Sequence, residues 1–329
     1  CKIGSICESF YTKMKINLTQ NKNFKLFKII SKVAQENNQT VYIVGGYVRD
    51  LLMQRKAPTD IDFVTEQSGI ELAKAVGKEL GDLKVSVFKT YGTAMIKYKD
   101  LDLEFVGARK ESYSEDSRKP AVETGTLEDD QKRRDFTVNA LAISLNAENF
   151  GELIDPFNGR EDMQNKILRT PLEPAQTYSD DPLRMMRAIR FASVLHFEIE
   201  KNSLEAIKQE AERIKIVSME RIMVEFNKIM LSEKPSVGLK LMEETTLLEK
   251  IIPELTALRG IEEVEGQTHK DNFWHTLEVV DNISKNTDNL WLRWAALLHD
   301  IGKAPTKKFV EKIGWTFHGH EFLGSKMVK

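Results

Sequence analysis

The chain has 329 residues, of which 41% are hydrophobic and 30% charged, a composition typical of a globular protein with two or three domains. The net charge of −2 argues against a uniformly basic coat for nucleic acid, although a local basic groove would not alter that sum. Two cysteines, Cys1 and Cys7, argue against a disulfide framework and favour the cytoplasm. No run approaches the roughly 18 apolar residues that span a bilayer, so we expect no membrane association.

Both ends of the chain carry unusual features. We expect Met14 to be the natural start, with the residues before it a translated extension, and we expect residues 1–23 to be disordered. The last residues, 327–329, continue a helix-like pattern without a terminating signal. This pattern predicts a truncated product.

The first half of the chain mixes helical and strand-like patterns. In chain order we expect a helix at 24–36, a strand at 41–44, a helix at 48–53, a strand at 61–64, a helix at 70–80, and strands at 85–88, 94–98 and 101–106. Residues 112–134 mix both signs of charge and are expected to form a mobile loop. The elements up to about residue 155 indicate an α/β or α+β head domain.

Beyond Pro156 the pattern becomes helical. We expect helices at about 182–195, 203–213, 218–231 and 236–244, with no convincing strand among them. The whole chain is therefore predicted to be α+β, with a mixed sheet and flanking helices followed by an all-helical part.

Asp60 and Asp62 precede an apolar strand-like run, and residues two apart on a strand face the same side. Two close carboxylates repel each other unless a cation lies between them, and Mg²⁺ is the usual cation where phosphates are involved. The alternative is a solvated strand start.

Gly45 and Gly46 follow a strand-like run and precede a helical one, so their bare backbone could approach a phosphate closely. Arg49 adds a positive charge nearby, and the carboxylate pair begins 14 residues after Gly46. The alternative for the glycines is a tight turn that needs a positive φ. Together, the turn and the carboxylates predict a nucleotidyl-transfer site.

Four segments, taken in order, extend this pattern over roughly residues 40–195. They are Gly45-Gly46-x-Val48-Arg49-Asp50, Asp60-x-Asp62, Arg133-Arg134-Asp135-Phe136-Thr137-x-Asn139-Ala140 and Asp180-Asp181-Pro182-Leu183-Arg184-x-x-Arg187-Ala188-x-Arg190-Phe191. With them the sequence resembles the class II tRNA nucleotidyltransferase (CCA-adding) and bacterial poly(A) polymerase family.

The resemblance implies that Asp60 and Asp62 hold two Mg²⁺ ions, one for the RNA 3′ hydroxyl and one for the triphosphate. Glu104 lies where the family has a further acidic residue on a neighbouring strand, and it is the third predicted catalytic residue. Its alternative is a polar residue on an exposed strand face.

The resemblance also implies a set of nucleotide-binding residues, in which arginine forks suit phosphate oxygens and side chains replace a template in reading CTP or ATP. The implied set is Gly45, Gly46, Arg49, Arg133, Arg134, Asp135, Asn139, Asp181, Arg184, Arg187 and Arg190. Within it, Asp181 and Arg184 would read the base edge. For Arg190, contact with RNA and a solvated helix face both stay open.

Four of the six histidines fall between residues 275 and 320. The run around His299 and Asp300, together with His275 and His320, resembles an HD domain. Such a set suits a divalent transition metal and the hydrolysis of phosphate esters. The HD pattern expects a further aspartate beyond His320, so our hypothesis is an incomplete domain with weak or absent phosphohydrolase activity.

The resemblance gives a domain plan of an extension (1–23), a nucleotidyltransferase head (24–165), a helical neck and body that binds the nucleotide base and RNA (166–265), and a truncated helical HD domain (266–329). The leading hypothesis is CCA addition to tRNA from CTP and ATP, and residues 106–113 look more like CCA-adding members. The alternatives are a poly(A) polymerase and an HD phosphohydrolase with a nucleotide- or RNA-binding head. The sequence carries no signal for an oligomeric state.

Overall fold

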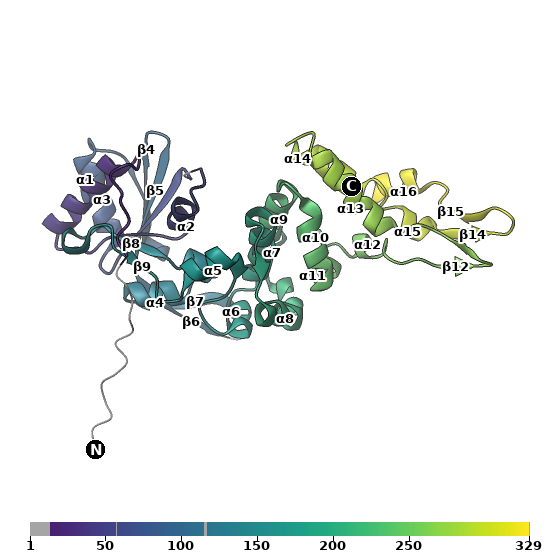
Figure 1. Ribbon diagram of the computed structural model, residues 1–329, viewed down its shortest axis with the longest axis horizontal. Helices are drawn as coiled ribbons and strands as arrows, with labels where there is room; N and C mark the ends of the chain where they lie inside the picture. Colours follow the sequence, from purple (N-terminus) through teal and green to yellow (C-terminus); the bar gives the residue numbers. More distant parts are fainter. Residues whose placement is uncertain (1–13, 57, 115–116, 329) are drawn as a thin grey trace, which may run out of the picture. The chain divides into compact units, whose positions relative to one another are not determined.

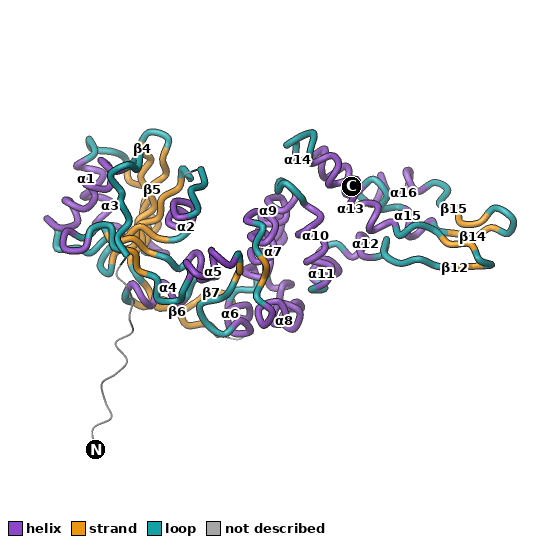
Figure 2. Tube along the Cα trace, in the orientation of Figure 1, coloured by secondary structure: helices purple, strands orange, loops and turns teal. Residues whose placement is uncertain are grey.

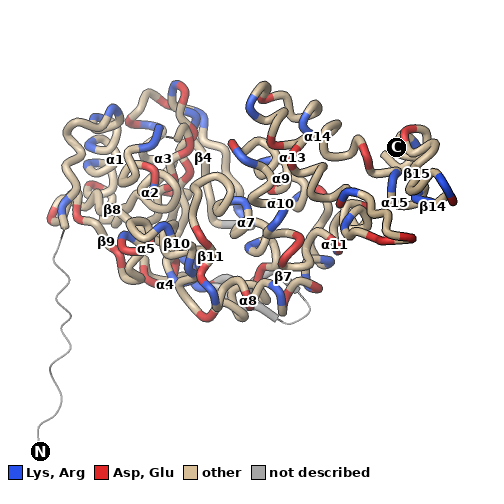
Figure 3. The backbone as a smooth tube through the Cα atoms, turned by 45° about the vertical axis from the view of Figure 1, so that its right-hand side comes forward, with Lys and Arg blue, Asp and Glu red and all other residues tan. Residues whose placement is uncertain are grey.

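The computed structural model describes residues 14–56, 58–114 and 117–328 and divides into two compact units (Figure 1). The first unit comprises Cys1–Ser112 and Pro120–Gln164, and the second comprises Tyr113–Lys119 and Asn165–Lys329. Acidic and basic residues are mixed along both units (Figure 3), in keeping with the small net charge. Within the described ranges, no helix is both long enough and apolar enough to cross a bilayer.

A seven-stranded mixed sheet forms the centre of the first unit (Figure 2). Its strand order is β3-β4-β5-β2-β1-β8-β9, and β2 pairs with β5 in parallel whereas the other neighbours are antiparallel. The strands are β1 (Tyr42–Val44), β2 (Asp60–Thr65), β3 (Val85–Phe88), β4 (Thr93–Tyr98), β5 (Leu101–Gly107), β8 (Ala142–Ser144) and β9 (Leu153–Ile154). The sheet confirms the predicted fold class and the five predicted strands, and it adds β8 and β9.

Helices α1 (Phe24–Glu36) and α3 (Gly69–Glu79) contribute to the core that covers this sheet. Apolar residues recur along both helices every three or four positions, so that each helix buries one stripe. Phe27 of α1 packs edge-on against Phe63 of β2, and Phe63 stacks on Phe105 of β5 with ring centroids 5.0 Å apart. This aromatic core fixes the two strands that carry the candidate carboxylates.

The segment expected to be a mobile loop forms a hairpin and a helix instead, so that prediction was wrong. These elements are β6 (Arg109–Ser114), which pairs with β7 (Ser117–Thr124), and α4 (Leu127–Lys132). The helix begins at a capping box, in which Thr126 and Asp129 each accept a backbone hydrogen bond from the other. A mixture of charges in a sequence does not exclude a regular backbone.

Residues 14–23, expected to belong to a disordered extension, are part of the first unit, and residues 1–13 lie outside the described residues. The Ile16 N–H donates to the Gly151 carbonyl at 2.7 Å, and Leu18 is buried. The Asn23 side chain donates to the Tyr47 hydroxyl at 3.1 Å. The expectation of disorder is therefore wrong for residues 14–23.

The second unit is largely helical, and the four helices predicted at 182–244 are confirmed. After α5 (Gly159–Asn165), the helices are α6 (Pro174–Asp180), α7 (Leu183–Leu195), α8 (Lys201–Glu210), α9 (Met219–Met230), α10 (Pro235–Glu244), α11 (Leu247–Ile251), α12 (Pro253–Thr256), α13 (Asn272–Ser284), α14 (Leu290–Leu298), α15 (Lys303–Thr306) and α16 (His320–Met327).

Three short ribbons correct the expectation of a strand-free second half. They are β10 (Ile167–Leu168) with β11 (Glu198–Ile199), β12 (Glu263–Val264) with β13 (Gln267–Thr268), and β14 (Lys308–Val310) with β15 (Gly314–Thr316). Strands of two or three residues are too short for an alternating pattern to stand out in a sequence.

Arg293, on α14, is buried and joins several elements of the second unit. Its Nη1 donates to the carbonyls of Met230 and Ser232 at 2.7 and 2.8 Å. Its Nη2 donates to the Ser284 carbonyl at 3.0 Å, and its Nε to the Thr287 carbonyl at 2.9 Å. One guanidinium thus satisfies carbonyls at the ends of α9 and α13, groups that a helix leaves without partners.

Candidate functional site

The glycine turn lies between β1 and α2 (Gly46–Leu52) and depends on the backbone of Gly45. Gly45 has φ 73° and ψ −139°, a conformation that residues with a Cβ rarely adopt. A Cβ at this position would lie 2.9 Å from Arg134 Nη1 and 3.5 Å from Asp62 Oδ2. The turn therefore brings a bare backbone, a guanidinium and a carboxylate to one place.

The candidate carboxylates come from two adjacent parallel strands. Asp60 and Asp62 lie two residues apart on β2, so they share one face of the sheet. The register of β2 and β5 sets Asp62 opposite Glu104. Strand pairing therefore brings Glu104 to the predicted pair, a neighbourhood that the sequence alone left open.

Charge repulsion within this group is only partly compensated. Burial raises the pKa of the Asp62 carboxyl, and the charges of Asp60 and Asp130 raise it further, against the opposing effect of Arg134. Burial and the charge of Asp62 likewise raise the pKa of Glu104, with Arg109 opposing. A bound cation would relieve this repulsion, so the residues present fit a hard divalent ion with oxygen ligands.

Asp130, on α4, was not predicted, although it contacts two predicted residues. It is fully buried and accepts hydrogen bonds from both Arg133 and Arg134. Burial favours the neutral carboxyl, but Arg134 and Arg133 outweigh that effect and hold the pKa of Asp130 below its usual range. The signal was present, because a carboxylate three and four residues before an arginine pair lies on the same helical face.

Arg49 does not add an uncompensated positive charge to the glycine turn. Its guanidinium donates to both oxygens of Asp50, at 2.9 and 3.0 Å, and to Asn139 Oδ1 at 2.7 Å. Asn139 in turn donates to Asp135 Oδ1 at 2.9 Å. These four residues form one largely buried network that holds the middle of α2 against the segment after α4.

The predicted base-reading pair lies in the second unit, where α6 ends and α7 begins. Asp181 Oδ1 accepts the Leu183 N–H at 3.2 Å. Arg184 Nη1 makes a long hydrogen bond of 3.4 Å to the Thr177 carbonyl. Both side chains are half-buried.

The two further arginines of α7 contact other protein groups. Arg190 Nε lies 2.5 Å from the buried carboxylate of Glu225, and its guanidinium carbon lies 3.8 Å from the centroid of the Phe191 ring. The guanidinium carbon of Arg187 lies 5.5 Å from the same centroid. These contacts differ from those of a solvated helix face and join α7 to α9, and contact of Arg190 with RNA stays a prediction.

The predicted histidine cluster lies in the second unit, where His275 is part of α13 and His299 and Asp300 directly follow α14. Ligand atoms of His275, His299 and Asp300 all lie within 4.8 Å of one another, and no other such group of three occurs among the described residues. The three head carboxylates are therefore spread more widely than this cluster.

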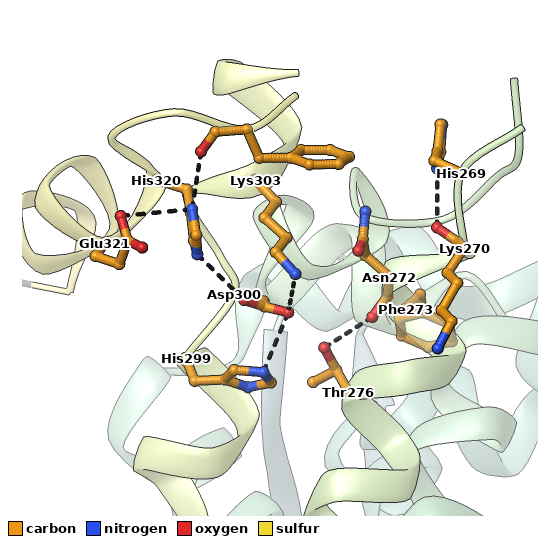
Figure 4. A network of polar contacts seen from close by, with 12 residues as sticks. His269, Lys270, Asn272, Phe273, Thr276, His299, Asp300, Lys303, His320 and Glu321 are labelled. Carbon is orange, nitrogen blue, oxygen red and sulfur yellow. Dashed lines mark hydrogen bonds and ion pairs between the residues drawn. The ribbon is translucent and has the colours of Figure 1, made fainter. Parts of the chain in front are cut away.

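Lys303 and His320 complete the surroundings of Asp300, which is buried. Lys303 Nζ lies 2.7 Å and His299 Nε2 3.1 Å from Asp300 Oδ2, and His320 Nε2 lies 3.6 Å from Oδ1. Figure 4 shows these three side chains pointing toward the one carboxylate. An ammonium group thus already provides a cation to the cluster.

Three domain families match the chain in succession. The Poly A polymerase head domain matches residues 41–169, the probable RNA and SrmB-binding site of polymerase A matches 196–258, and the HD domain matches 272–329. A solved tRNA-processing enzyme in its apo form I is 30% identical, covering 95% of this chain and 81% of that chain with a TM-score of 0.70. The chain belongs to the class II tRNA nucleotidyltransferase and bacterial poly(A) polymerase family. The predicted resemblance is confirmed.

Curated members of this nucleotidyltransferase family are longer than the chain. An A-adding tRNA nucleotidyltransferase of Aquifex aeolicus is 34% identical over 87% of this chain and 34% of the relative. A CCA-adding enzyme of Bacillus velezensis is 35% identical over 85% of this chain and 65% of the relative. The chain thus spans between about one third and two thirds of these relatives.

Nucleotidyltransferases of this family ordinarily use a divalent metal ion, and the head carboxylates fit that requirement. The HD match likewise accounts for the histidine cluster, because imidazole and carboxylate ligands suit a transition metal.

Proposed function

We propose that the chain adds CMP and AMP, from CTP and ATP, to the 3′ end of tRNA without a template, and so completes or repairs the CCA end. The observation that carries the proposal is the meeting of Asp62, Arg134 Nη1 and the Gly45 turn. A partly buried carboxylate suits a cation, and the guanidinium and backbone N–H groups suit phosphate oxygens. The proposed compartment is the cytoplasm, which the scarcity of cysteine favours.

Similar proteins support tRNA as the substrate. A tRNA nucleotidyltransferase solved with a primer tRNA and an incoming ATP analog is 29% identical, covering 90% of this chain and 79% of that chain with a TM-score of 0.65. Because the A. aeolicus relative is named for A addition alone, addition of A to an end that already carries CC is the variant to test. Poly(A) addition is the close alternative.

The proposed reaction is an in-line displacement, in which the tRNA 3′ oxygen attacks the α-phosphorus of the nucleotide and pyrophosphate leaves. Asp60 and Asp62, with Glu104 beside them, would hold two Mg²⁺ ions, and bound Mg²⁺ would supply activation of the hydroxyl and neutralisation of triphosphate charge. Arg134, whose Nη1 lies beside the glycine turn, would donate to the phosphates, and the absence of a Cβ at Gly45 would leave room for them.

Base selection is assigned to the second unit in this proposal. Asp181 offers carboxylate oxygens and Arg184 offers guanidinium donors, a combination that can match the acceptor and donor groups on the edge of cytosine or adenine. Because these side chains belong to the protein, the choice between CTP and ATP needs no template strand.

The test is incorporation of labelled CTP and ATP, separately and together, on tRNA transcripts that end before CCA or after CC. Addition that stops after C, C and A supports the proposal, and addition of A only to the CC end supports the variant. Long A tails on varied RNAs support a poly(A) polymerase. No incorporation with Mg²⁺ on either transcript contradicts the proposal.

Phosphate-ester hydrolysis at the HD cluster is the second candidate, and the observation that favours it is the gathering of His275, His299 and Asp300. Lys303 opposes it, because its ammonium already lies against Asp300. We therefore propose weak or absent hydrolysis. Robust metal-dependent release of phosphate from a cyclic nucleotide, retained in Asp60→Ala and lost in His299→Ala, would contradict this proposal.

A further inference from the structure

We propose that Asp130 is a positioning residue of the nucleotide site, which holds Arg134 so that its Nη1 nitrogen faces the Gly45 turn where a triphosphate would bind. The inference rests on the proposed function and identifies how the phosphate-binding guanidinium is aligned. Asp130 itself lies away from the substrate, because it is fully buried beneath the two arginines.

Asp130 engages both arginines through separate oxygens. Its Oδ2 accepts from Arg134 Nε at 3.1 Å and from Arg134 Nη2 at 2.9 Å. Its Oδ1 accepts from Arg133 Nε at 3.0 Å and also from Arg133 Nη2. Two nitrogens of the Arg134 guanidinium converge on one buried carboxylate oxygen, and these charge-assisted hydrogen bonds hold that edge of the group against Asp130. Arg134 is thus held along one edge.

The other edge of Arg134 is the one directed at the site. Its Nη1 makes a hydrogen bond of 3.4 Å to the Asn139 carbonyl, longer than an ordinary hydrogen bond. The same nitrogen lies 2.9 Å from where a Cβ at Gly45 would be, and Asp62 Oδ2 lies 3.5 Å from that point. Because the Arg134 Nη1 hydrogen bond to Asn139 is long and the guanidinium is held by Asp130, exchanging this bond for one to an entering phosphate should cost little free energy.

The helix that carries Asp130 is tied to the strand that carries the catalytic carboxylates. Glu66, which follows β2, accepts the Leu127 N–H at the start of α4 at 2.9 Å. Gln131 donates to the Ala140 carbonyl at 2.6 Å and thereby holds α4 to the segment before β8. Asp130 and Asp62 therefore belong to one rigid frame.

The charges of this group also suit a polyanionic ligand. Arg133 and Arg134 carry two positive charges and Asp130 one negative charge, so these three residues together keep a net charge of +1, although Asp62 adds a negative charge beside the turn. Because both arginines stabilise the ionised carboxyl, Asp130 keeps its charge through the neutral range. The carboxylate therefore orients Arg134 without cancelling the attraction of the pair for phosphate.

The experiment compares Asp130→Asn with wild-type protein in steady-state incorporation on tRNA. The amide keeps the shape but loses the charge that fixes both guanidinium groups, so we expect KM for CTP and for ATP to rise about 10- to 100-fold. The ratio of the two KM values stays unchanged, because the base-reading residues are untouched. A purely structural role would instead lower the amount of active protein, and so kcat, at constant KM.

Asp129→Asn is the matched control, because Asp129 is the adjacent acidic residue of α4, its side chain caps the helix at Thr126, and its bond to Arg133 is between backbone groups that the substitution leaves in place. Its KM values should stay within twofold of wild type. Asp130→Glu keeps the charge and should fold normally, yet its extra methylene displaces the guanidinium by about 1 Å, so KM should still rise.

The outcomes separate the inference from the proposed function. If wild-type protein incorporates no nucleotide, the proposed function fails. If wild type is active and both Asp130 variants keep KM within twofold for CTP and ATP, Asp130 is not a positioning residue. If KM rises in Asp130→Asn and in Arg134→Lys, and no further in the double variant, the two residues act as one unit and the inference stands.

Discussion

The two candidate metal sites among the described residues differ in how their negative charge is compensated. In the head, Asp62 and Glu104 lie opposite each other on adjacent strands, and burial together with neighbouring carboxylates raises the pKa of each: Asp60 and Asp130 act on Asp62, and Asp62 and Asp60 act on Glu104. In the HD cluster, Asp300 lies 2.7 Å from the ammonium of Lys303 and 3.1 Å from His299. A site whose charges remain uncompensated needs a cation from solution, whereas a site that contains its own cation does not.

The largest effect is expected for Asp62→Asn, which removes a proposed metal ligand together with the charge that acts most strongly on Glu104. Nucleotide incorporation should fall about 1,000-fold or more, because a charged ligand at the reacting centre is lost. The raised pKa of Asp62 means that its stabilising contribution is present when it is protonated and is lost as the pH rises through that pKa. The metal-free variant should therefore melt about 2 °C above wild type at pH 7.5.

Differential scanning calorimetry in EDTA and incorporation with Mg²⁺ measure the two effects of Asp62→Asn. Asp100→Asn, in the exposed turn between β4 and β5, is the control and should change neither. A variant that is inactive and also less stable than wild type would indicate that Asp62 holds the fold together, contrary to this comparison.

Gly45→Ala should have the next largest effect. The added methyl group meets Arg134 Nη1 and forces a positive φ on alanine, so incorporation should fall about 100-fold and stability by about 1 kcal/mol. Gly92→Ala provides the control, because Gly92 has φ 62° and no atom within 4 Å of an added Cβ. The control should lose similar stability but keep its activity. If both variants lost the same activity, the loss in Gly45→Ala would reflect lower stability, and the Gly45 turn would have no specific role in the nucleotide site.

Lys303→Met tests the other half of the comparison. Removing the ammonium leaves Asp300 uncompensated between histidines, so affinity of the HD cluster for Ni²⁺ or Zn²⁺ should rise about 10-fold. Isothermal titration calorimetry would measure it, and nucleotide addition should be unaffected. Lys307→Met, which removes a lysine paired with Glu262, serves as the control. Unchanged affinity in Lys303→Met would mean that Lys303 does not compete with a metal.

The smallest effect concerns the pH dependence of the head. Because the pKa values of Asp62 and Glu104 are raised, both carboxyls take up protons at a higher pH than ordinary side chains do. The Mg²⁺ concentration that gives half-maximal incorporation should therefore rise about 3-fold from pH 7.5 to pH 6. Titrations of Mg²⁺ at several pH values test this, and a constant requirement would contradict it.

The sequence predicted those elements and candidate site residues that a pattern of neighbouring residues can reveal. Asp60 and Asp62 needed only the period of a strand, and Gly45 only its place between a strand and a helix. The position of Glu104 beside Asp62 depends on the parallel pairing of β2 with β5, which no local pattern encodes. For the same reason, the sequence left open whether Glu104 belongs to the site or to an exposed strand face.

The partners of charged side chains were harder to predict than the helices and strands that carry them. Arg49 is committed to Asp50 and Asn139, and Arg190 to Glu225, because a buried guanidinium requires partners that only the folded chain supplies. Asp130 was overlooked in a segment whose mixed charges suggested a loop. Its burial, which gives it its role, is a tertiary property.

Arg293 bears on whether the HD segment can be treated as a removable module. Its guanidinium, which belongs to the HD segment, completes the hydrogen bonding of carbonyls at the end of α9, in the neck. Deleting the segment would expose these carbonyls and uncover the surface beneath α14, so the two parts should unfold as one cooperative block. The HD helices would then stabilise the preceding helices, independently of any chemistry at their histidines.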